Sequence, residues 1–312
     1  MADFRPGTDG ESAFLDDLVR HGHLIPSGEP GLYGRGSTFE AIRAGFDALV
    51  TEVAQEDAPE TLRFPPIIPK RILEEVGYLK SFPHLSGAIF SFGGDERRAA
   101  DLLETATRHG DWSEYLQMTD VVLLPAACYP AYPAIARRGV LPLDGATLDL
   151  GGSYVFRNEP SGDPARLQMF HQREMVRIGD EEQVLAWRER WMQRAAAIME
   201  RVGLDAKVDV ASDPFFGRGG RMLARNQREQ RLKFEVLVPI ASPERTAVTS
   251  FNYHQDHFGS AYGIVRADGE TAHSACLGFG LERITLSLLR THGLELREWP
   301  DDVRTAVVGG RR

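Results

Sequence analysis

The sequence has 312 residues, of which 42% are hydrophobic and 26% charged, with 31 glycines and 18 prolines, a composition that fits a folded globular protein and excludes a collagen-like or low-complexity chain. Its 45 acidic residues against 36 basic ones give a net charge of −9, which disfavours a large nucleic-acid footprint because a polyanionic partner needs a basic face. No apolar stretch approaches the roughly 18 residues of a membrane span, the acidic start is unlike a signal peptide, and two cysteines are too few for a disulfide framework, so we expect a cytoplasmic protein with reduced thiols.

The first third of the chain predicts helices and short strands in alternation. A short helix over residues 12–21 is followed by loop, and then by an amphipathic helix with Thr38 as its N-cap and apolar residues at helical spacing from Phe39 to Val53. Residues 63–82 begin with an apolar run that contains three prolines, which suits an edge strand because proline has no N–H to donate. Two β-like runs then flank a predicted helix over residues 95–110.

The remainder predicts a long hairpin, a helix and a set of short strands. Residues 150–160 and 170–179 are two predicted strands whose connection, PSGDPARLQ, is too long for a tight turn and therefore indicates a function. Residues 181–203 give the clearest helix, ended by Gly203. Further β-like runs lie at 206–212, 232–240, 246–254 and 261–267, before SACLGFGLERITLSLLRTHG, which predicts a glycine-containing turn that opens an apolar helix. The late connections are too short for helical crossovers, so the pattern predicts an α+β fold built on an antiparallel sheet flanked by helices.

Two arginine-bearing runs carry the candidate chemistry. Arg157 lies in FRNE on a predicted strand, and Arg283 lies in GFGLER where the last long helix opens. A guanidinium on a strand can fork onto phosphate oxygens, and a second one behind glycines can reach the same anion, which suits a nucleoside triphosphate. Either arginine alone is more often the partner of a carboxylate. The P-loop and the dinucleotide-binding glycine motif are both missing, which disfavours the common nucleotide folds.

In order and spacing these runs resemble the motifs of class II aminoacyl-tRNA synthetases. FRNEP, the long loop and FHQREMVRIG are similar to motif 2, LGFGLERITLSLL to motif 3, and RFPPIIPKRILEEVGYLKSF to motif 1, which builds the dimer interface of that class. GGSYVFRNEPSGDPARLQMFHQRE, ASDPFFGRGG, LKFEVLVP, SFNYHQDHFG and HSACLGFGLER resemble more closely the amino acid:[carrier protein] ligases, homologues of the catalytic domain of atypical zinc-dependent seryl-tRNA synthetases. The resemblance makes residues 30–312 one class II synthetase-like catalytic domain and leaves residues 1–29 as an N-terminal segment without a role.

An ATP site is implied by this resemblance, with Mg²⁺ expected beside the nucleotide. In it Arg157 holds the α-phosphate, Glu159 orients the nucleotide or the substrate amine, and Arg283 binds the γ-phosphate side and covers the adenine. The other residues implied to line ATP are Arg166, Leu167, Lys233, Ala247, Val248, Thr249 and Ser250. Motif 2 usually closes with an aromatic that stacks on the adenine, and the matching position is assigned to Met175, whose thioether can pack on a ring instead.

The resemblance also implies a zinc site on Cys128, Glu174 and Cys276. Three protein ligands leave a tetrahedral zinc ion one open position, which the substrate α-amino group can take, and thiolates with a carboxylate suit zinc better than magnesium. Without the resemblance, two cysteines so far apart would be interpreted as inert core thiols. Because no ligand spacing links the nearby histidines, they are interpreted as packing or hydrogen-bonding residues; these are His171, His254, His257 and His273.

The implied function is ATP-dependent activation of a small amino acid as its adenylate and transfer to the phosphopantetheine thiol of an acyl or peptidyl carrier protein, by a homodimer. Arg190, Arg194 and Arg201 share one face of the helix over 181–203 and are the predicted dock for an acidic carrier. Two alternatives stay open. An aminoacyl-tRNA synthetase is disfavoured by the acidic charge and by the lack of a tRNA-binding arm. An inactive paralogue acting as a regulatory binding module is disfavoured by the retained arginines and zinc ligands.

Overall fold

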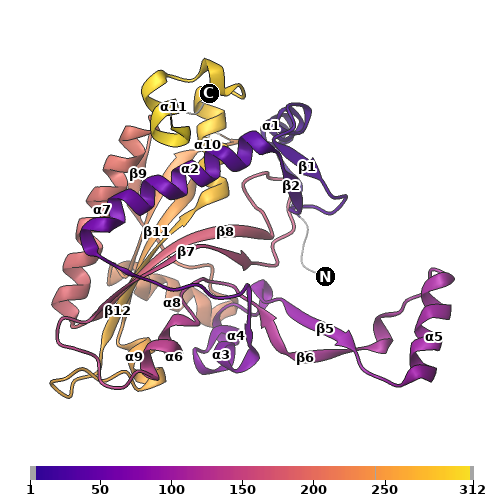
Figure 1. Cartoon of the computed structure of the whole chain (residues 1–312), viewed down its shortest axis with the longest axis horizontal. Helices are drawn as coiled ribbons and strands as arrows, with labels where there is room; N and C mark the ends of the chain where they lie inside the picture. The colour runs from indigo at the N-terminus through magenta and orange to yellow at the C-terminus, as the bar shows by residue number, and fades with distance from the viewer. Residues whose placement is uncertain (1–4, 243, 310–312) are drawn as a thin grey trace.

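The structure is a computed structural model that describes residues 5–242 and 244–309. Its centre is a seven-stranded sheet, in which only the short strand at one edge, β3, pairs in parallel with its neighbour (Figure 1). The strands in spatial order are β3 (Glu60–Thr61), β7 (Ala146–Phe156), β8 (Met169–Gly179), β12 (His273–Gly280), β11 (Arg245–Gln255), β10 (Lys233–Pro239) and β9 (Lys207–Val210). The predicted α+β fold on an antiparallel sheet flanked by helices is confirmed.

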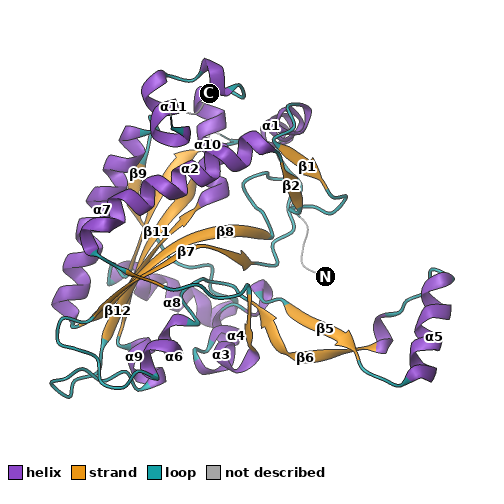
Figure 2. Cartoon of the chain, in the orientation of Figure 1, coloured by secondary structure: helices purple, strands orange, loops and turns teal. Residues whose placement is uncertain are grey.

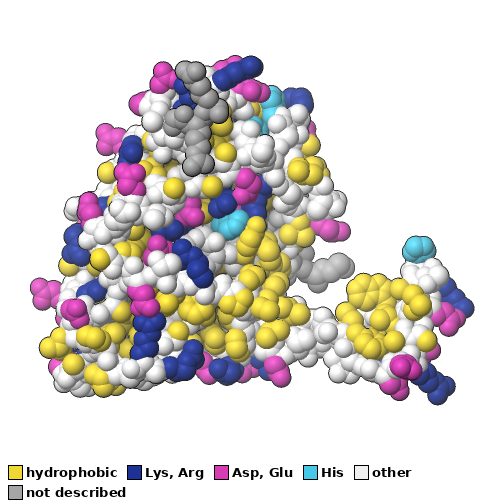
Figure 3. Space-filling model, viewed as in Figure 1, with side chains coloured by type: hydrophobic (Ala, Val, Ile, Leu, Met, Phe, Trp, Pro, Cys, Tyr) yellow, Lys and Arg dark blue, Asp and Glu magenta, His cyan; other side chains and the backbone are white. Residues whose placement is uncertain are grey.

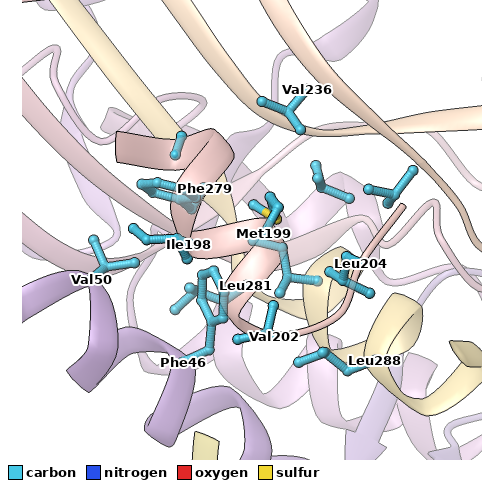
Figure 4. Packing of buried hydrophobic residues seen from close by; sticks show 14 of the residues in the cluster. Phe46, Val50, Ile198, Met199, Val202, Leu204, Val236, Phe279, Leu281 and Leu288 are labelled. Carbon is cyan, nitrogen blue, oxygen red and sulfur yellow. The ribbon is translucent and has the colours of Figure 1, made fainter. Parts of the chain in front are cut away.

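One face of this sheet is covered by five helices that build the main core. They are α1 (Asp9–Arg20), α2 (Ser37–Ala54), α7 (Glu181–Arg201), α10 (Leu281–His292) and α11 (Asp301–Val308). Figure 4 shows how Phe46 of α2 and Ile198 and Met199 of α7 meet Phe279 of β12 in this core. Each such side chain contributes about 1.5–3 kcal/mol when fully buried, so the layer forms a rigid platform behind the sheet.

The opposite face is covered by loops and mostly short helices around a second, smaller core. These helices are α3 (Lys70–Glu75), α4 (Tyr78–Ser81), α6 (Ala131–Ala136), α8 (Gly217–Glu229) and α9 (His257–Tyr262). The second core contains Cys128 and Cys276, and the rings of Tyr132 and Phe258 stack there with centroids 3.9 Å apart. Short elements leave room between them, and the candidate site lies on this face.

A separate three-stranded sheet carries an arm that projects from the body (Figure 2). Its order is β4 (Ile67–Pro69), β6 (Leu116–Leu123) and β5 (Ala88–Phe92), and α5 (Glu96–Thr107) follows β5 at the tip. The proline-rich run is therefore an edge strand, as predicted. The remaining elements are the hairpin β1 (Leu24–Pro26) and β2 (Tyr33–Arg35) and the 3₁₀ turns η1 (Gln55–Asp57), η2 (Pro83–Leu85), η3 (Ser113–Tyr115) and η4 (Leu296–Glu298).

Three local predictions are wrong, each for a physical reason. SACLGFG is not a turn but most of strand β12, which is buried on both faces and so lacks the alternation that marks a half-exposed strand. The predicted strand over 261–267 is instead the end of α9, a turn with Gly263 at φ 64°, and two isolated bridges at Val265 and Arg266. Thr38 lies inside α2, whose N-cap is Gly36. Helices α8 and α11 had no counterpart in the sequence prediction.

The segment assigned to residues 1–29 lies within the fold where the structure describes it. Residues 1–4 are outside the described part, but α1 buries Phe14 and Leu18 in the main core, and the boundary at residue 30 stays a prediction. None of the described helices has both the length and the apolar composition of a bilayer span. The cytoplasmic location also stays a prediction.

Candidate active site

A pocket of about 500 Å³ opens on the sheet face that carries the short helices, over strands β8, β12 and β11. Successive strand residues point to opposite faces, and the register sets Gly278 of β12 between Glu174 of β8 and Ser250 of β11. A Cβ at Gly278 would lie 2.8 Å from Nε2 of Gln172, so glycine at this position keeps the pocket floor open.

Cys128, Glu174 and Cys276 meet at one end of the pocket, although they come from the loop before α6, from β8 and from β12. One ligand atom from each lies within 4.8 Å of the others, and all three side chains are buried. The second carboxylate oxygen of Glu174 is buried without a hydrogen-bond partner. Asn252 Nδ2 and His254 Nε2 each lie 3.5 Å from the Cys276 sulfur, so they surround the cluster from β11.

Without a bound cation, the surroundings favour the protonated forms of Cys128 and Glu174. The adjacent Cys276 thiol, burial and the Glu174 carboxylate raise the pKa of Cys128 well above its usual value, and burial raises the pKa of Glu174. A divalent ion reverses this preference, because it replaces the protons with ligand bonds. Two thiolates and a carboxylate are a donor set that zinc prefers, so the residues present fit zinc. Burial also lowers the pKa of His254 to about 3, so its ring is neutral, in keeping with its predicted hydrogen-bonding role.

Two buried or half-buried guanidinium groups lie toward the other end of the pocket. Arg157 follows β7, where its Nε donates to the Pro125 carbonyl at 3.3 Å. Arg283 is in the first turn of α10 and donates to the carbonyls of Ala165 at 2.8 Å and Ala247 at 2.9 Å. Burial, together with the positive charge of Arg166 and Arg157, lowers the pKa of Arg283. Neither Arg157 nor Arg283 forms an ion pair with any residue that the structure describes, which leaves their charge available for an anion.

The other residues predicted to contact ATP gather around these two arginines, with one exception. Ala247, Val248, Thr249 and Ser250 of β11 line the pocket, as does Lys233 of β10. Lys233 is paired with Asp213 at 2.6 Å and Glu235 at 2.9 Å. Glu159 and Leu167 line a smaller adjoining cavity with Arg157 and Arg283. Arg166 lines neither cavity, and instead lies 3.7 Å from both Glu159 and Asp163.

The assignment of Met175 as the adenine contact is wrong. Met175 is fully buried in the main core, on the far side of β8 from the pocket. Phe170 lines both cavities, and the Arg157 guanidinium lies 5.6 Å from its ring centroid. Residues 170, 172 and 174 share the pocket face of β8 by alternation, so the strand period itself favours Phe170 as the aromatic next to the nucleotide.

Sequence reasoning missed three further pocket residues. Asp213 accepts hydrogen bonds from Lys233 and Gln227, Asn252 contacts Cys276, and Gln172 accepts from the backbone N–H of Ala127 at 3.1 Å. The even-numbered period of β8 and β11 indicated Gln172 and Asn252 once Glu174 and Ser250 were assigned. Asp213 lies in ASDPFFGRGG, a run that carries the family resemblance, but no role was assigned to it.

The structure disfavours the predicted carrier-docking face on α7. Arg194 is paired with Glu56 and Asp57, and Arg201 with Glu52, so acidic residues of the same chain neutralise much of this face. Helix α7 also packs on the sheet face opposite the pocket. A carrier bound there would be separated from the pocket by the sheet.

No protein-family model matches the chain, but individual relatives do. It is 47% identical over 278 residues to amino acid–[acyl-carrier-protein] ligase 1 of Bradyrhizobium diazoefficiens, covering 89% of the chain and 85% of the relative. Ligase 2 of the same organism is 46% identical, with 89% and 83% covered. The type-2 serine–tRNA ligase of Methanopyrus kandleri is 27% identical over 85% of the chain, which spans 53% of that protein.

The fold is also found among solved structures. The chain superposes on the seryl-tRNA synthetase of M. kandleri, solved with a tRNA of A. aeolicus, with a TM-score of 0.80 and 23% identity, over 97% of the chain and 60% of the synthetase. The prolyl-tRNA synthetase of Cryptosporidium parvum gives a TM-score of 0.62 at 12% identity, over 90% of the chain and 52% of that enzyme. These matches identify the fold as that of class II synthetase catalytic domains.

Proposed function

The chain belongs to the amino acid–[acyl-carrier-protein] ligases, and we propose that its pocket activates a small amino acid with ATP and transfers it to the phosphopantetheine thiol of a carrier protein. One observation carries the assignment of the pocket: a Cys–Glu–Cys cluster and two arginines without ion pairs in the described chain line one pocket. The cluster suits the amine end of the substrate, and the arginines suit a polyphosphate.

In the first half-reaction a carboxylate oxygen of the amino acid attacks the α-phosphorus, and the bond to pyrophosphate breaks. Arg157 and Arg283 are proposed to neutralise the charge that develops on the phosphate oxygens. The guanidinium of Arg283 is fixed by the Ala165 and Ala247 carbonyls, so little reorganisation is needed when the charge appears. Phe170 is proposed to pack against the adenine.

The amine of the substrate is proposed to bind at the cluster end. Cys128, Glu174 and Cys276 would hold zinc, which when bound supplies one open coordination position for a neutral amine. Tyr129 and Phe258 line the pocket near Cys128, with ring centroids 6.0 Å apart. Their bulk limits the space beside the amine, which supports a small amino acid such as glycine or alanine.

In the second half-reaction the carrier thiol attacks the carbonyl carbon of the adenylate, and AMP leaves. Helix α8 is the proposed docking element, because Leu223 and Gln227 on its inner side line the pocket. Arg221 and Arg228 lie two turns apart on its outer side, and both are exposed. An acidic carrier would meet this basic face directly beside the pocket.

The test measures the two half-reactions separately. ATP–pyrophosphate exchange across the twenty amino acids should succeed with a small one, and mass spectrometry should then find the aminoacyl group on a holo-carrier protein. Charging of tRNA without loading of any carrier would favour the synthetase alternative, although the chain spans only about half of the serine–tRNA ligases that it matches. Exchange with none of the twenty would favour a regulatory paralogue.

A further inference from the structure

The first described residues run along the loop that joins β7 and β8. Arg5 forms a parallel bridge with Ser161: its N–H donates to the Pro160 carbonyl at 3.3 Å, and its carbonyl accepts from the Gly162 N–H at 2.9 Å. The Ser161 hydroxyl lies 3.3 Å from the same carbonyl. Ser161 is 1% exposed, so this contact is part of the packed structure.

A second contact joins the far end of the same loop to the β1–β2 hairpin. The backbone N–H of Gln168 donates to the Gly31 carbonyl at 2.9 Å, and its side-chain Nε2 donates to the Pro30 carbonyl at 2.8 Å. Figure 1 shows this hairpin beside the ends of β7 and β8. Backbone from the first 31 residues therefore holds the loop at both ends.

Hydrogen bonds within the loop connect these two contacts to both arginines of the proposed nucleotide site. The Ser161 hydroxyl accepts from the Asp163 N–H at 3.1 Å, and the Asp163 carboxylate accepts from the Ala165 N–H at 2.9 Å. The Ala165 carbonyl then accepts from Arg283. At the other end the Gln168 carbonyl accepts from the backbone N–H of Arg157 at 2.8 Å. The two contacts with the N-terminal segment thus lead within a few hydrogen bonds to the Arg283 guanidinium and to the Arg157 backbone.

Packing at the first contact leaves no space for a side chain. A Cβ on Gly162 would lie 2.6 Å from the Gly7 nitrogen and 3.3 Å from its Cα, and a Cβ on Gly7 would lie 3.0 Å from the Gly162 carbonyl oxygen. Both neighbours are backbone atoms, so any larger residue must push the two segments apart.

We propose that residues 5–7 and 30–31, the N-terminal strap, position the 157–168 loop so that Arg157 and Arg283 are set for ATP before it binds. This inference rests on the proposed function of the site. The strap residues touch no substrate in this arrangement, so they are positioning residues. The consequence is that their loss affects ATP more than the amino acid, whose amine binds at the far end of the pocket.

Two variants test the strap by independent routes. Gly162→Ala forces residues 5–7 off the loop, and deletion of residues 2–7 removes them while keeping Thr8, the N-cap of α1. In both, the KM for ATP in pyrophosphate exchange should rise by about tenfold or more. The KM for the amino acid and the zinc content should stay at the wild-type values. Trypsin cleavage after Arg166 should become faster, which reports on the loop without reference to activity.

Asp16→Asn, on the exposed side of α1, is the matched control and should change none of these quantities. Unchanged ATP KM and unchanged cleavage in both variants would overturn the proposal. So would an equal rise in both KM values with a lowered Tm, because that is the result of a merely structural role. If the wild type shows no exchange at all, the proposed function fails, and the cleavage rates still decide whether the strap holds the loop.

Discussion

Arg283 is a residue that lowers the stability of the free protein but can strengthen the binding of an anionic substrate. Its guanidinium is half-buried, and its hydrogen bonds go to neutral carbonyls, while Arg166 and Arg157 add positive charge nearby. Desolvating a charge without a counter-ion costs several kcal/mol. In the proposed function a polyphosphate would supply the missing negative charge, so ATP would bind more tightly for having Arg283 there.

Replacing either arginine therefore has a specific expected result. Arg157→Ala or Arg283→Ala should remove on the order of 3 kcal/mol of transition-state stabilisation, so adenylate formation should fall by about 10² or more. Exchange kinetics measure this, and circular dichroism checks that the fold is kept. Arg166→Ala is the comparison, since Arg166 lines neither cavity, and should cost clearly less. Wild-type exchange in both of the first two variants would show that ATP binds elsewhere.

The Cys–Glu–Cys cluster gives a second prediction about single residues. We expect about one zinc per chain by inductively coupled plasma mass spectrometry, and Cys276→Ser or Cys128→Ser should lose the metal together with amino-acid activation, because the remaining two ligands bind zinc weakly. Ser113→Ala, on an exposed turn of the arm, should keep both. A metal-free preparation that activates the amino acid at the normal rate would refute the assignment.

The sequence predicts some of the pocket residues and misses others. Arg157 and Arg283 stand out from their own runs, whereas the three proposed zinc ligands follow only from the resemblance. The structure brings each set together in one pocket. Phe170 could have been chosen over Met175 from strand alternation alone, since 170 and 174 have the same parity. Asp213 lies in the ASDPFFGRGG run that carries the resemblance, but only the fold shows that it pairs with Lys233. Contacts of this kind depend on tertiary structure.

Among the helices and strands, the sequence mispredicts those whose tertiary surroundings override the local propensity of their residues. Strand β12 contains two glycines and small residues, which favour a turn, yet it is buried between β8 and β11. Helix α8 begins with GRGG, a poor helix start by propensity, and still forms beside the pocket. Long elements with a clear period, α2 and α7, were predicted with nearly their observed bounds.

Helix α8 also gives the prediction that separates the two half-reactions. Arg221→Glu with Arg228→Glu should slow thioester formation by about tenfold and weaken its salt dependence, because docking of an acidic partner is steered by these charges. Pyrophosphate exchange should be nearly unchanged. The matched control is Arg190→Glu with Arg201→Glu on α7, which should load carrier at the wild-type rate. If the α7 pair slows loading and the α8 pair does not, carrier docks on the other side of the sheet.

In the whole molecule, the projecting arm exposes hydrophobic side chains on which no other part of the described chain packs. Phe90 and Met118 are directly opposite each other on β5 and β6, and they are 54% and 52% exposed. None of the residues of α5 is buried. Figure 3 shows hydrophobic side chains gathered on the arm and where it joins the body. Beyond β4 the arm is a two-stranded ribbon, which is marginal in water unless something packs on it. A second copy of the chain is therefore the expected cover, in line with the dimer interface implied by the motif 1 resemblance of residues 63–82.

Sedimentation tests this directly. At micromolar concentration the wild type should give about twice the chain mass of 34.7 kDa, in keeping with a two-fold dimer whose interface is self-complementary. Phe90→Asp with Met118→Asp should shift the protein toward monomer, because two carboxylates would have to be desolvated in the interface without partners. Glu104→Gln, on the exposed surface of α5, controls for charge on the arm and should stay dimeric. A wild-type monomer with full exchange activity would show that neither the arm nor the motif 1 segment needs a partner, and that the pocket is complete within one chain.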